Sequence, residues 1–298
     1  MAEVATTNEI LSGNAPRTNE LRRFMRVFLG RKVVLVGVII ILALIITALF
    51  APQIAPHDPV KQNLRMALQS PSSEHLLGTD PLGRDILSRI IYGSRVSLAV
   101  GFIAVGIGGV LGMTLGLLAG YFGRIVDLLI MRFIDAMMAI PPLMLALVLG
   151  VSLGGGLNNV MIALGVSLLP TYARLMRGQV LAVKQADYVK AGEVVGCSDF
   201  RIMFRHVLPN CLPPLIVLVT LNLGVAILSE ASLSFLGLGI SPPGAAWGAM
   251  VYDGYTHLMT NPLLSFAPGI CIMLVVLAFN IAGDGLRDVL DPRLRGTI

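Results

Sequence analysis

The segment from residue 185 to residue 210 has the residue types of a docking element rather than of a catalytic site. Its sequence predicts two short helices that meet at a glycine corner. Asp187 is placed to cap the first helix and Gly196 to end it, while Ser198 is placed to cap the second and Pro209 to follow its close. Such a compact helical unit between two apolar runs suggests contact with a partner.

Small residues make the first of these helices narrow. Ala191, Gly192 and Gly196 leave little side-chain bulk beside its charged residues. A narrow surface helix with a few charges suits insertion into a groove on another protein. An amphipathic helix that lies on a membrane surface and merely connects two spans fits the same residues equally well.

Polar side chains also interrupt the apolar runs, where a charged residue costs about 2.5–3.5 kcal/mol on insertion scales. Arg132 and Asp135 are three residues apart, so they can pair on one helical face. Asn222 and Glu230 are separated by about two helical turns and could line a polar path for a substrate. Pairing of Glu230 with another chain, or contact with interfacial water, is the alternative.

Two connecting segments carry the remaining candidates. Asp80, Arg84 and Asp85 form either an ion pair that stabilises the fold or part of a docking surface. The segment 237–261 contains Trp247 with two tyrosines, which predicts membrane-interface anchors or, alternatively, a gating or binding-protein contact.

Several kinds of chemistry find no support in the sequence. A phosphate-binding Walker A loop requires a Gly-Lys pair, and the chain has none, so any ATP chemistry must belong to another subunit. The four histidines show no metal-ligand spacing, and the three cysteines form no CxxC pair. We therefore expect no catalytic residue, metal or cofactor on this chain.

The composition places these residues in a membrane protein. Of the 298 residues, 55% are hydrophobic and only 13% are charged, with a mean hydropathy of +0.82. The net charge of +5 does not indicate nucleic-acid binding, because the basic residues flank apolar runs instead of gathering on one face.

Helical lengths of about 1.5 Å per residue predict six membrane-spanning helices. The charge-free run 136–173 is too long for one crossing, so it must turn back at Gly154-Gly155-Gly156, and Pro141-Pro142 should kink the helix before that turn. Four glycines at spacing four, from Gly108 to Gly120, predict close approach of a neighbouring helix. The predicted spans are 33–51, 96–123, 127–151, 158–174, 213–236 and 262–283.

Lysine and arginine counts predict the orientation. With the N-terminus inside, seventeen basic residues fall on the inner side and five on the outer side. Both termini and the segment 185–210 are then cytoplasmic. The predicted units are a cytoplasmic segment 1–32, a first helix with its outer loop 33–95, a five-helix core 96–290 that includes the loop 177–211, and a cytoplasmic tail 291–298.

Two other classes of membrane protein fit the sequence less well. An intramembrane protease would need paired aspartates within the bilayer, but Asp253 falls in a connecting segment. The Gly-x-Gly-Asp motif of that class is also incomplete before Asp284, because Ile281 stands at the position of its first glycine. A channel or an ATP-independent transporter would need no docking helix between two spans.

The motif at residues 188–196, Tyr-Val-Lys-Ala-Gly-Glu-Val-Val-Gly, with Ile202 and His-Val-Leu-Pro-Asn at 206–210, resembles the loop signature of binding-protein-dependent ABC importer permeases. Segments 77–85, 230–239, 242–248 and 278–292 are similar to the peptide and nickel importer branch, in particular its dipeptide "C-type" subunit. The match runs in order from about Arg22 to Arg295. Lys190 and Gly192 depart from the usual signature, which has Glu and Ala there.

The resemblance implies an all-α type I ABC importer permease with six transmembrane helices and a cytoplasmic coupling helix. It implies a homologous second permease, two cytoplasmic ATPase subunits that hold ATP and Mg²⁺, and an external binding protein that delivers di- or oligopeptides, with glutathione or nickel chelates as alternatives. The implied location is the bacterial inner membrane. The implied ATPase contacts are Tyr188, Ala191, Gly192, Glu193, Gly196, Asp199 and Arg205.

Overall fold

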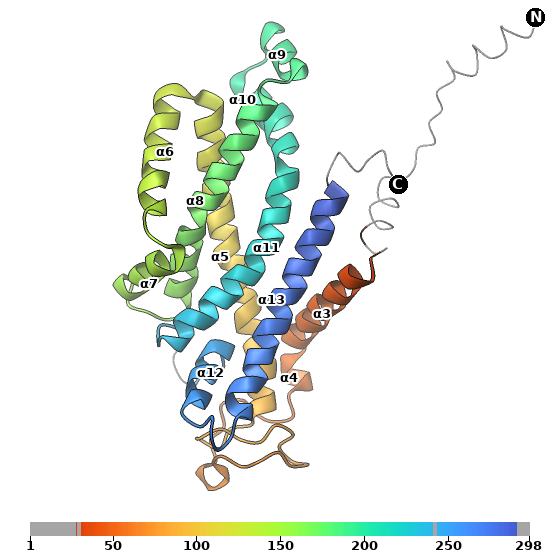
Figure 1. Ribbon diagram of the computed structural model, residues 1–298, viewed down its shortest axis with the longest axis vertical. Helices are drawn as coiled ribbons and strands as arrows, with labels where there is room; N and C mark the ends of the chain where they lie inside the picture. The colour runs from red at the N-terminus through yellow and green to blue at the C-terminus, as the bar shows by residue number, and fades with distance from the viewer. Residues whose placement is uncertain (1–27, 29–30, 241–242, 291–298) are drawn as a thin grey trace, which may run out of the picture.

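The protein is an elongated helical bundle (Figure 1). The structure is a computed structural model, and it describes residue 28, residues 31–240 and residues 243–290. Most of the predicted segment 1–32, the tail 291–298 and Pro242 of the 242–248 motif lie outside these residues. Within them the regular structure is helical, apart from one isolated bridge between Thr79 and Asp85. The predicted all-α class is confirmed.

Five of the described helices are long and apolar enough to cross a membrane. They are α3 (Lys32–Leu49), α5 (Ile86–Phe122), α8 (Leu157–Val183), a run that ends in α11 (Leu208–Phe235), and α13 (Leu263–Leu290). The pair α6 (Arg124–Met138) and α7 (Pro142–Ser152) adds a sixth if it is counted as one bent span. The bend between α6 and α7 is 90°, so the predicted kink at Pro141-Pro142 is a full break.

Several of the helices run past the charge-free segments that predicted them. Helix α5 begins ten residues before the expected start at residue 96, because Asp85 caps it by accepting a hydrogen bond from the Ser88 backbone N–H at 2.8 Å. Helix α8 continues to Val183 instead of ending near residue 174. Charged side chains on these extensions, such as Arg89 and Arg177, find partners inside the protein.

The glycine stripe of α5 packs directly against α8, and these two helices form the most extensive contact of the bundle. A Cβ atom placed on Gly112 would lie 2.5 Å from the Leu169 carbonyl oxygen, and one on Gly116 would lie 2.3 Å from the Ala173 carbonyl oxygen. Both distances are too short for any side chain. The predicted close approach of a neighbouring backbone is therefore confirmed, and α8 is that neighbour.

Ion pairs also connect α6 to α8. Arg132 and Asp135 pair as predicted at 3.8 Å, but Asp135 lies closer to Arg174 of α8, at 2.7 Å. Arg177 of α8 donates two hydrogen bonds to Asp127, at 2.5 and 2.6 Å. The spacing of residues in the sequence did not predict these ion pairs between α6 and α8.

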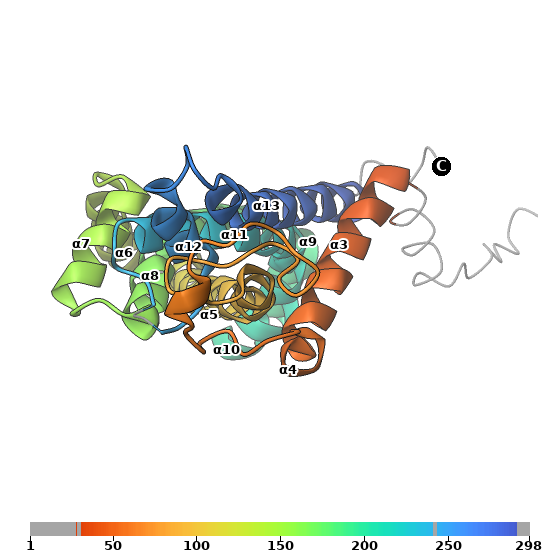
Figure 2. The same ribbon diagram turned by 90° about the horizontal axis from the view of Figure 1, so that it is seen from below.

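The remaining short elements lie at the two ends of the bundle. Helices α9 (Asp187–Val194) and α10 (Asp199–Arg201), followed by a π-helical turn (Ile202–Val207), stand at one end. Helix α4 (Ala51–Ile54), the turn Leu64–Met66, α12 (Trp247–Tyr255) and the irregular chain before α5 form the other, which Figure 2 shows from below.

Candidate functional site

Helix α9 projects from the bundle as an exposed tip (Figure 1). Asp187 is its first residue, not its cap; Ala186 holds the cap position without a side-chain hydrogen bond. The helix ends where Gly196 adopts φ = +83°, with backbone hydrogen bonds from Gly196 to Glu193 and from Cys197 to Gly192. This is a Schellman end, and the predicted glycine corner is confirmed.

The second short helix departs from the prediction. Ser198 holds the cap position of α10 but makes no side-chain cap bond. Pro209 does not close this helix, because the chain continues through the π-helical turn into α11, of which Pro209 is the second residue. The tip is therefore joined to the α11 span without a loop.

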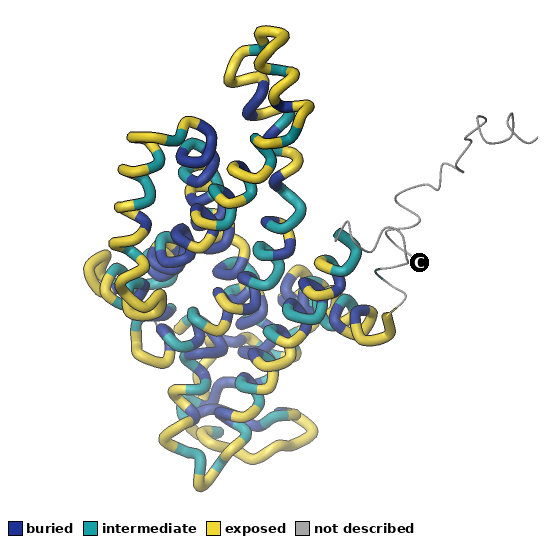
Figure 3. The backbone as a smooth tube through the Cα atoms, turned by 45° about the horizontal axis from the view of Figure 1, so that its top comes forward, coloured by how far each residue is buried: buried dark blue, intermediate teal, exposed yellow. Residues whose placement is uncertain are grey.

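Apolar side chains cover the tip. Val194 is 88% exposed, Val195 81% and Phe200 69%. In Figure 3 most of the tube at this end of the bundle has the yellow of exposed residues. Such a cluster in a position with few intramolecular contacts indicates a surface that a partner covers. The sequence reasoning missed these residues, although two adjacent valines before a glycine corner were a visible signal.

The coupling residues expected from the family resemblance surround this tip. Six of them are exposed and Gly192 is half-buried, packed near Ile202. The exposed ones are Tyr188, Ala191, Glu193, Gly196, Asp199 and Arg205. Asp199 also has an internal role, since it accepts a hydrogen bond from the Tyr121 hydroxyl at 2.8 Å.

A second tie holds the base of the tip to the end of α5. Lys184 donates a hydrogen bond to the Tyr121 backbone carbonyl at 2.6 Å, and its ammonium lies 4.9 Å from the centre of the Tyr121 ring. On the inner side of α9, Val189 is 1% exposed. The tip is therefore attached to α5, to the end of α8 and to the start of α11.

The opposite end contains a buried ion cluster built on Asp80. Arg84 donates to Asp80 at 2.6 Å, and the backbone N–H groups of Leu82 and Arg84 donate to its other oxygen at 2.9 Å. Arg89 lies 3.6 Å from the same carboxylate. Asp80, Arg84 and Asp85 are all at most 5% exposed, so here they support the fold, and a docking role for them stays a prediction.

Arg89 joins three segments that are distant in the sequence. Its guanidinium donates to the carbonyls of Pro59 at 3.2 Å, Pro243 at 3.4 Å and Gly244 at 3.3 Å. Trp247, predicted as a surface aromatic, is instead 2% exposed and donates its indole N–H to the Ile90 carbonyl at 2.9 Å. The exposed aromatics of this region are Tyr252 and Tyr255.

Arg89→Ala should loosen this whole end of the protein. The change removes one buried cation and leaves three carbonyls without their donor, which should cost about 3 kcal/mol or more. We expect the thermal unfolding midpoint of the purified chain to fall by several degrees and limited proteolysis to cut near residues 59 and 243. Arg65→Ala, which changes an exposed arginine of the loop before α5, is the control; equal behaviour of the two variants would contradict the assignment.

The predicted substrate-path residues are buried within the bundle. Glu230 is fully buried; one of its oxygens accepts a hydrogen bond from the Ser234 hydroxyl at 2.5 Å, and the other has no partner among the described residues. Asn222, 8% exposed, faces the Tyr172 hydroxyl of α8. Their part in a substrate path stays a prediction.

Comparison with known proteins adds independent findings. Residues 112–296 match the model of the family described as "Binding-protein-dependent transport system inner membrane component", and residues 20–71 match the "N-terminal TM domain of oligopeptide transport permease C". Among curated relatives, the dipeptide transport system permease protein DppC of Alkalihalophilus pseudofirmus is 45% identical over 264 residues, which cover 89% of this chain and 87% of that protein. The glutathione transport system permease protein GsiD of Pectobacterium atrosepticum is 42% identical over 275 residues, 92% of this chain and 91% of that protein.

Among solved structures, a chain of the inward-facing MetNI methionine ABC transporter matches with a TM-score of 0.56 and 20% identity. The match covers 69% of this chain and 98% of that one. At this identity the likeness concerns the fold alone.

Proposed function

Because the chain belongs to the family of binding-protein-dependent transport system inner membrane components, we propose that it is the permease subunit through which separate ATPases drive peptide import. It has the type I ABC importer permease fold and is a multi-pass inner membrane protein. A homologous second permease completes the pathway, and an external binding protein delivers the substrate. Of the structural observations, the exposed apolar tip on α9 supports this proposal most.

The proposed coupling follows from the way in which the tip is attached. The excess of basic residues on its side of the membrane supports a cytoplasmic position, within reach of ATPase subunits. When two ATPases close on ATP, a groove on each would carry one permease tip with it. Since the tip is tied to α5 by Asp199 and Lys184 and continues into α11, the spans should move with it as rigid bodies.

Peptides are the proposed cargo. Relatives at 41–45% identity are named for dipeptide, di/tripeptide or D,D-dipeptide transport, which supports this class. Glutathione is the second candidate, favoured by the relative from Pectobacterium atrosepticum and by the tripeptide nature of that molecule. Nickel chelates have no comparable support.

Uptake into proteoliposomes tests the proposed function. The chain is reconstituted with the second permease, the ATPases and the binding protein encoded beside it, with ATP enclosed on the ATPase side. We expect a labelled dipeptide to accumulate only with ATP and only when this chain is present, and excess unlabelled dipeptide to compete better than glutathione. Uptake that needs neither ATP nor this chain would contradict the function, and preferential competition by glutathione would change the cargo.

A further inference from the structure

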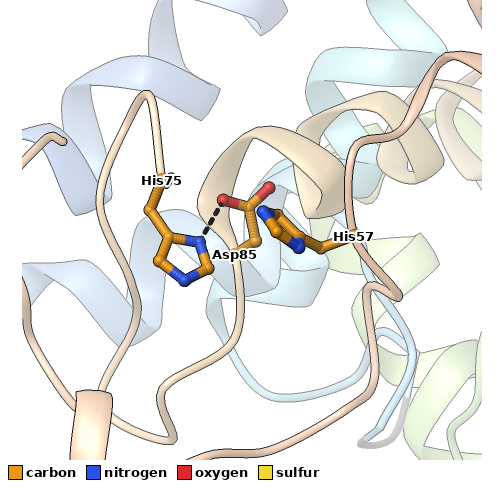
Figure 4. Close-up of side chains that lie close together, drawn as sticks. All are labelled: His57, His75 and Asp85. Atoms are coloured by element: carbon orange, nitrogen blue, oxygen red, sulfur yellow. Dashed lines mark hydrogen bonds and ion pairs between the residues drawn. The ribbon is translucent and has the colours of Figure 1, made fainter. Parts of the chain in front are cut away.

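Two histidines and an aspartate that are distant in the sequence meet at the end of the bundle opposite α9. One ligand atom from each of His57, His75 and Asp85 lies within 4.8 Å of the others, and the three side chains converge in Figure 4. His75 and Asp85 are 7% and 2% exposed, and His57 is half-buried. We propose that these three residues form a binding site for a divalent transition-metal ion of the zinc type.

The donor set fits such an ion. Two imidazoles with one carboxylate favour Zn²⁺ and related transition metals over Mg²⁺ and Ca²⁺, which prefer oxygen ligands. Three protein ligands leave one tetrahedral position for water or a further group. Among the described residues, this is the one group of three or more His, Cys, Asp or Glu side chains whose ligand atoms lie close enough together to share an ion.

The geometry requires little rearrangement. With metal–ligand bonds of about 2.0–2.1 Å, two ligands of a tetrahedral ion are separated by about 3.3 Å. His75 Nδ1 and Asp85 Oδ1 are already 2.9 Å apart, so a metal ion can replace the proton that they share. The ligand atoms lie within 4.8 Å of one another, so no pair has to approach by more than about 1.5 Å to bind one ion.

Neighbouring contacts orient two of the ligands. The second oxygen of Asp85 accepts the Ser88 N–H at the start of α5, at 2.8 Å. The His57 ring is held by contact of Nε2 with the Glu74 carbonyl at 2.9 Å, and the His57 backbone N–H donates to the Ser88 hydroxyl at 3.0 Å. Supporting bonds of this kind are characteristic of metal ligands.

An ion also has a path to the site. His57 forms part of the wall of a cavity of about 760 Å³, which Asp58, Tyr92 and Arg95 also line. His57 thus faces both the cluster and a space large enough for a hydrated ion to enter.

The position gives such an ion a structural purpose. Between α4 and α5 the chain contains only the turn Leu64–Met66 and the Thr79–Asp85 bridge. His57 stands near the beginning of this stretch and Asp85 at its end, with His75 between them. A shared metal ion would close the loop at three points, which gives most stabilisation where a segment has little core of its own. The inference does not depend on the transport function.

Cobalt spectroscopy tests the site on the full chain purified with its partner subunits. After chelator treatment, Co²⁺ is titrated alone, followed by Zn²⁺. We expect one equivalent of Co²⁺ to give the visible absorption of a low-coordinate nitrogen and oxygen site, without a thiolate charge-transfer band, and Zn²⁺ to displace it. No visible band in the wild-type chain, or a thiolate band from the cysteines, would overturn the proposal.

Substitutions identify the ligands. His57→Gln and His75→Gln should each weaken Co²⁺ binding by at least about 100-fold, more than loss of an outer-shell partner. His257→Gln, a histidine outside the cluster, should leave it unchanged. His57→Gln decides the matter if His75→Gln fails to fold, because the His57 ring is only half-buried. Unchanged Co²⁺ binding by His57→Gln would show that the three residues form a hydrogen-bonded clamp only.

Discussion

Gly116→Val should prevent the chain from folding, while Gly106→Val on the same helix should be tolerated. A Cβ atom at residue 116 would lie 2.3 Å from the Ala173 carbonyl oxygen and 2.8 Å from the Met176 Cβ atom of α8. These atoms belong to the backbone or are fixed to it, so relief requires the two helices to separate. A Cβ atom at residue 106 would meet nothing within 4 Å.

The expected cost is large because separation affects the whole α5–α8 seam. Overpacking by a single group costs about 1–3 kcal/mol, and here several contacts along the helix would be lost with it, so about 4 kcal/mol or more is expected. Size-exclusion chromatography of the expressed variants gives the result: a monodisperse peak for Gly106→Val and an aggregated or absent peak for Gly116→Val. Equal recovery of both would show that α5 and α8 do not pack as described.

The double variant Val194→Asp/Val195→Asp should abolish binding of ATPase subunits without disturbing the bundle. Both side chains are more than 80% exposed, so two carboxylates there cost the isolated chain little. In an apolar groove of a partner the same charges would be buried without counter-ions, and we expect at least about a 100-fold loss of affinity. Pull-down with the tagged chain measures the bound ATPase.

The matched control for this experiment lies at the other end of the molecule. Met259 is 100% exposed, so Met259→Asp also places a carboxylate at an exposed apolar position, one where the double variant has two, and should leave ATPase binding intact. Gly196→Trp is a less selective probe, because φ = +83° would strain any side chain there. If the valine variant retained the ATPase as well as wild type does, the docking surface would have to lie elsewhere.

The sequence was most informative where local spacing alone decides the structure. Four glycines at intervals of four residues predicted a close helix contact, the run Gly154-Gly155-Gly156 predicted the turn between α7 and α8, and Gly196 predicted the corner after α9. In each case the required geometry follows from the residue type. The family resemblance supplied the fold class and the expected partners.

Contacts between distant segments were beyond such reasoning. Asp135 was expected to pair with Arg132, but the register of α6 against α8 brings Arg174 closer. Trp247 was expected at the surface, yet folding of the segment 243–247 onto α5 buries it. Histidines eighteen residues apart showed no ligand spacing, and only the irregular loop before α5 brings His57 and His75 together.

The spans that correspond to α5 and α8 were predicted too short for a related reason. Charged residues were taken as limits of the spans, whereas Arg89 and Arg177 lie within helices because each has a carboxylate partner. A charged side chain within the bilayer costs less when an opposite charge pairs with it. The partners, Asp80 and Asp127, come from segments whose positions the sequence did not reveal.

The most direct test of the central claim, that this chain is the membrane subunit of an ATP-driven importer, is purification of the tagged chain from cells that also express its neighbouring genes. The account predicts that it elutes with a second permease and with two ATPase subunits, and that the eluted complex hydrolyses ATP. Elution of the folded chain alone, without ATPase subunits and without ATP hydrolysis, would contradict it.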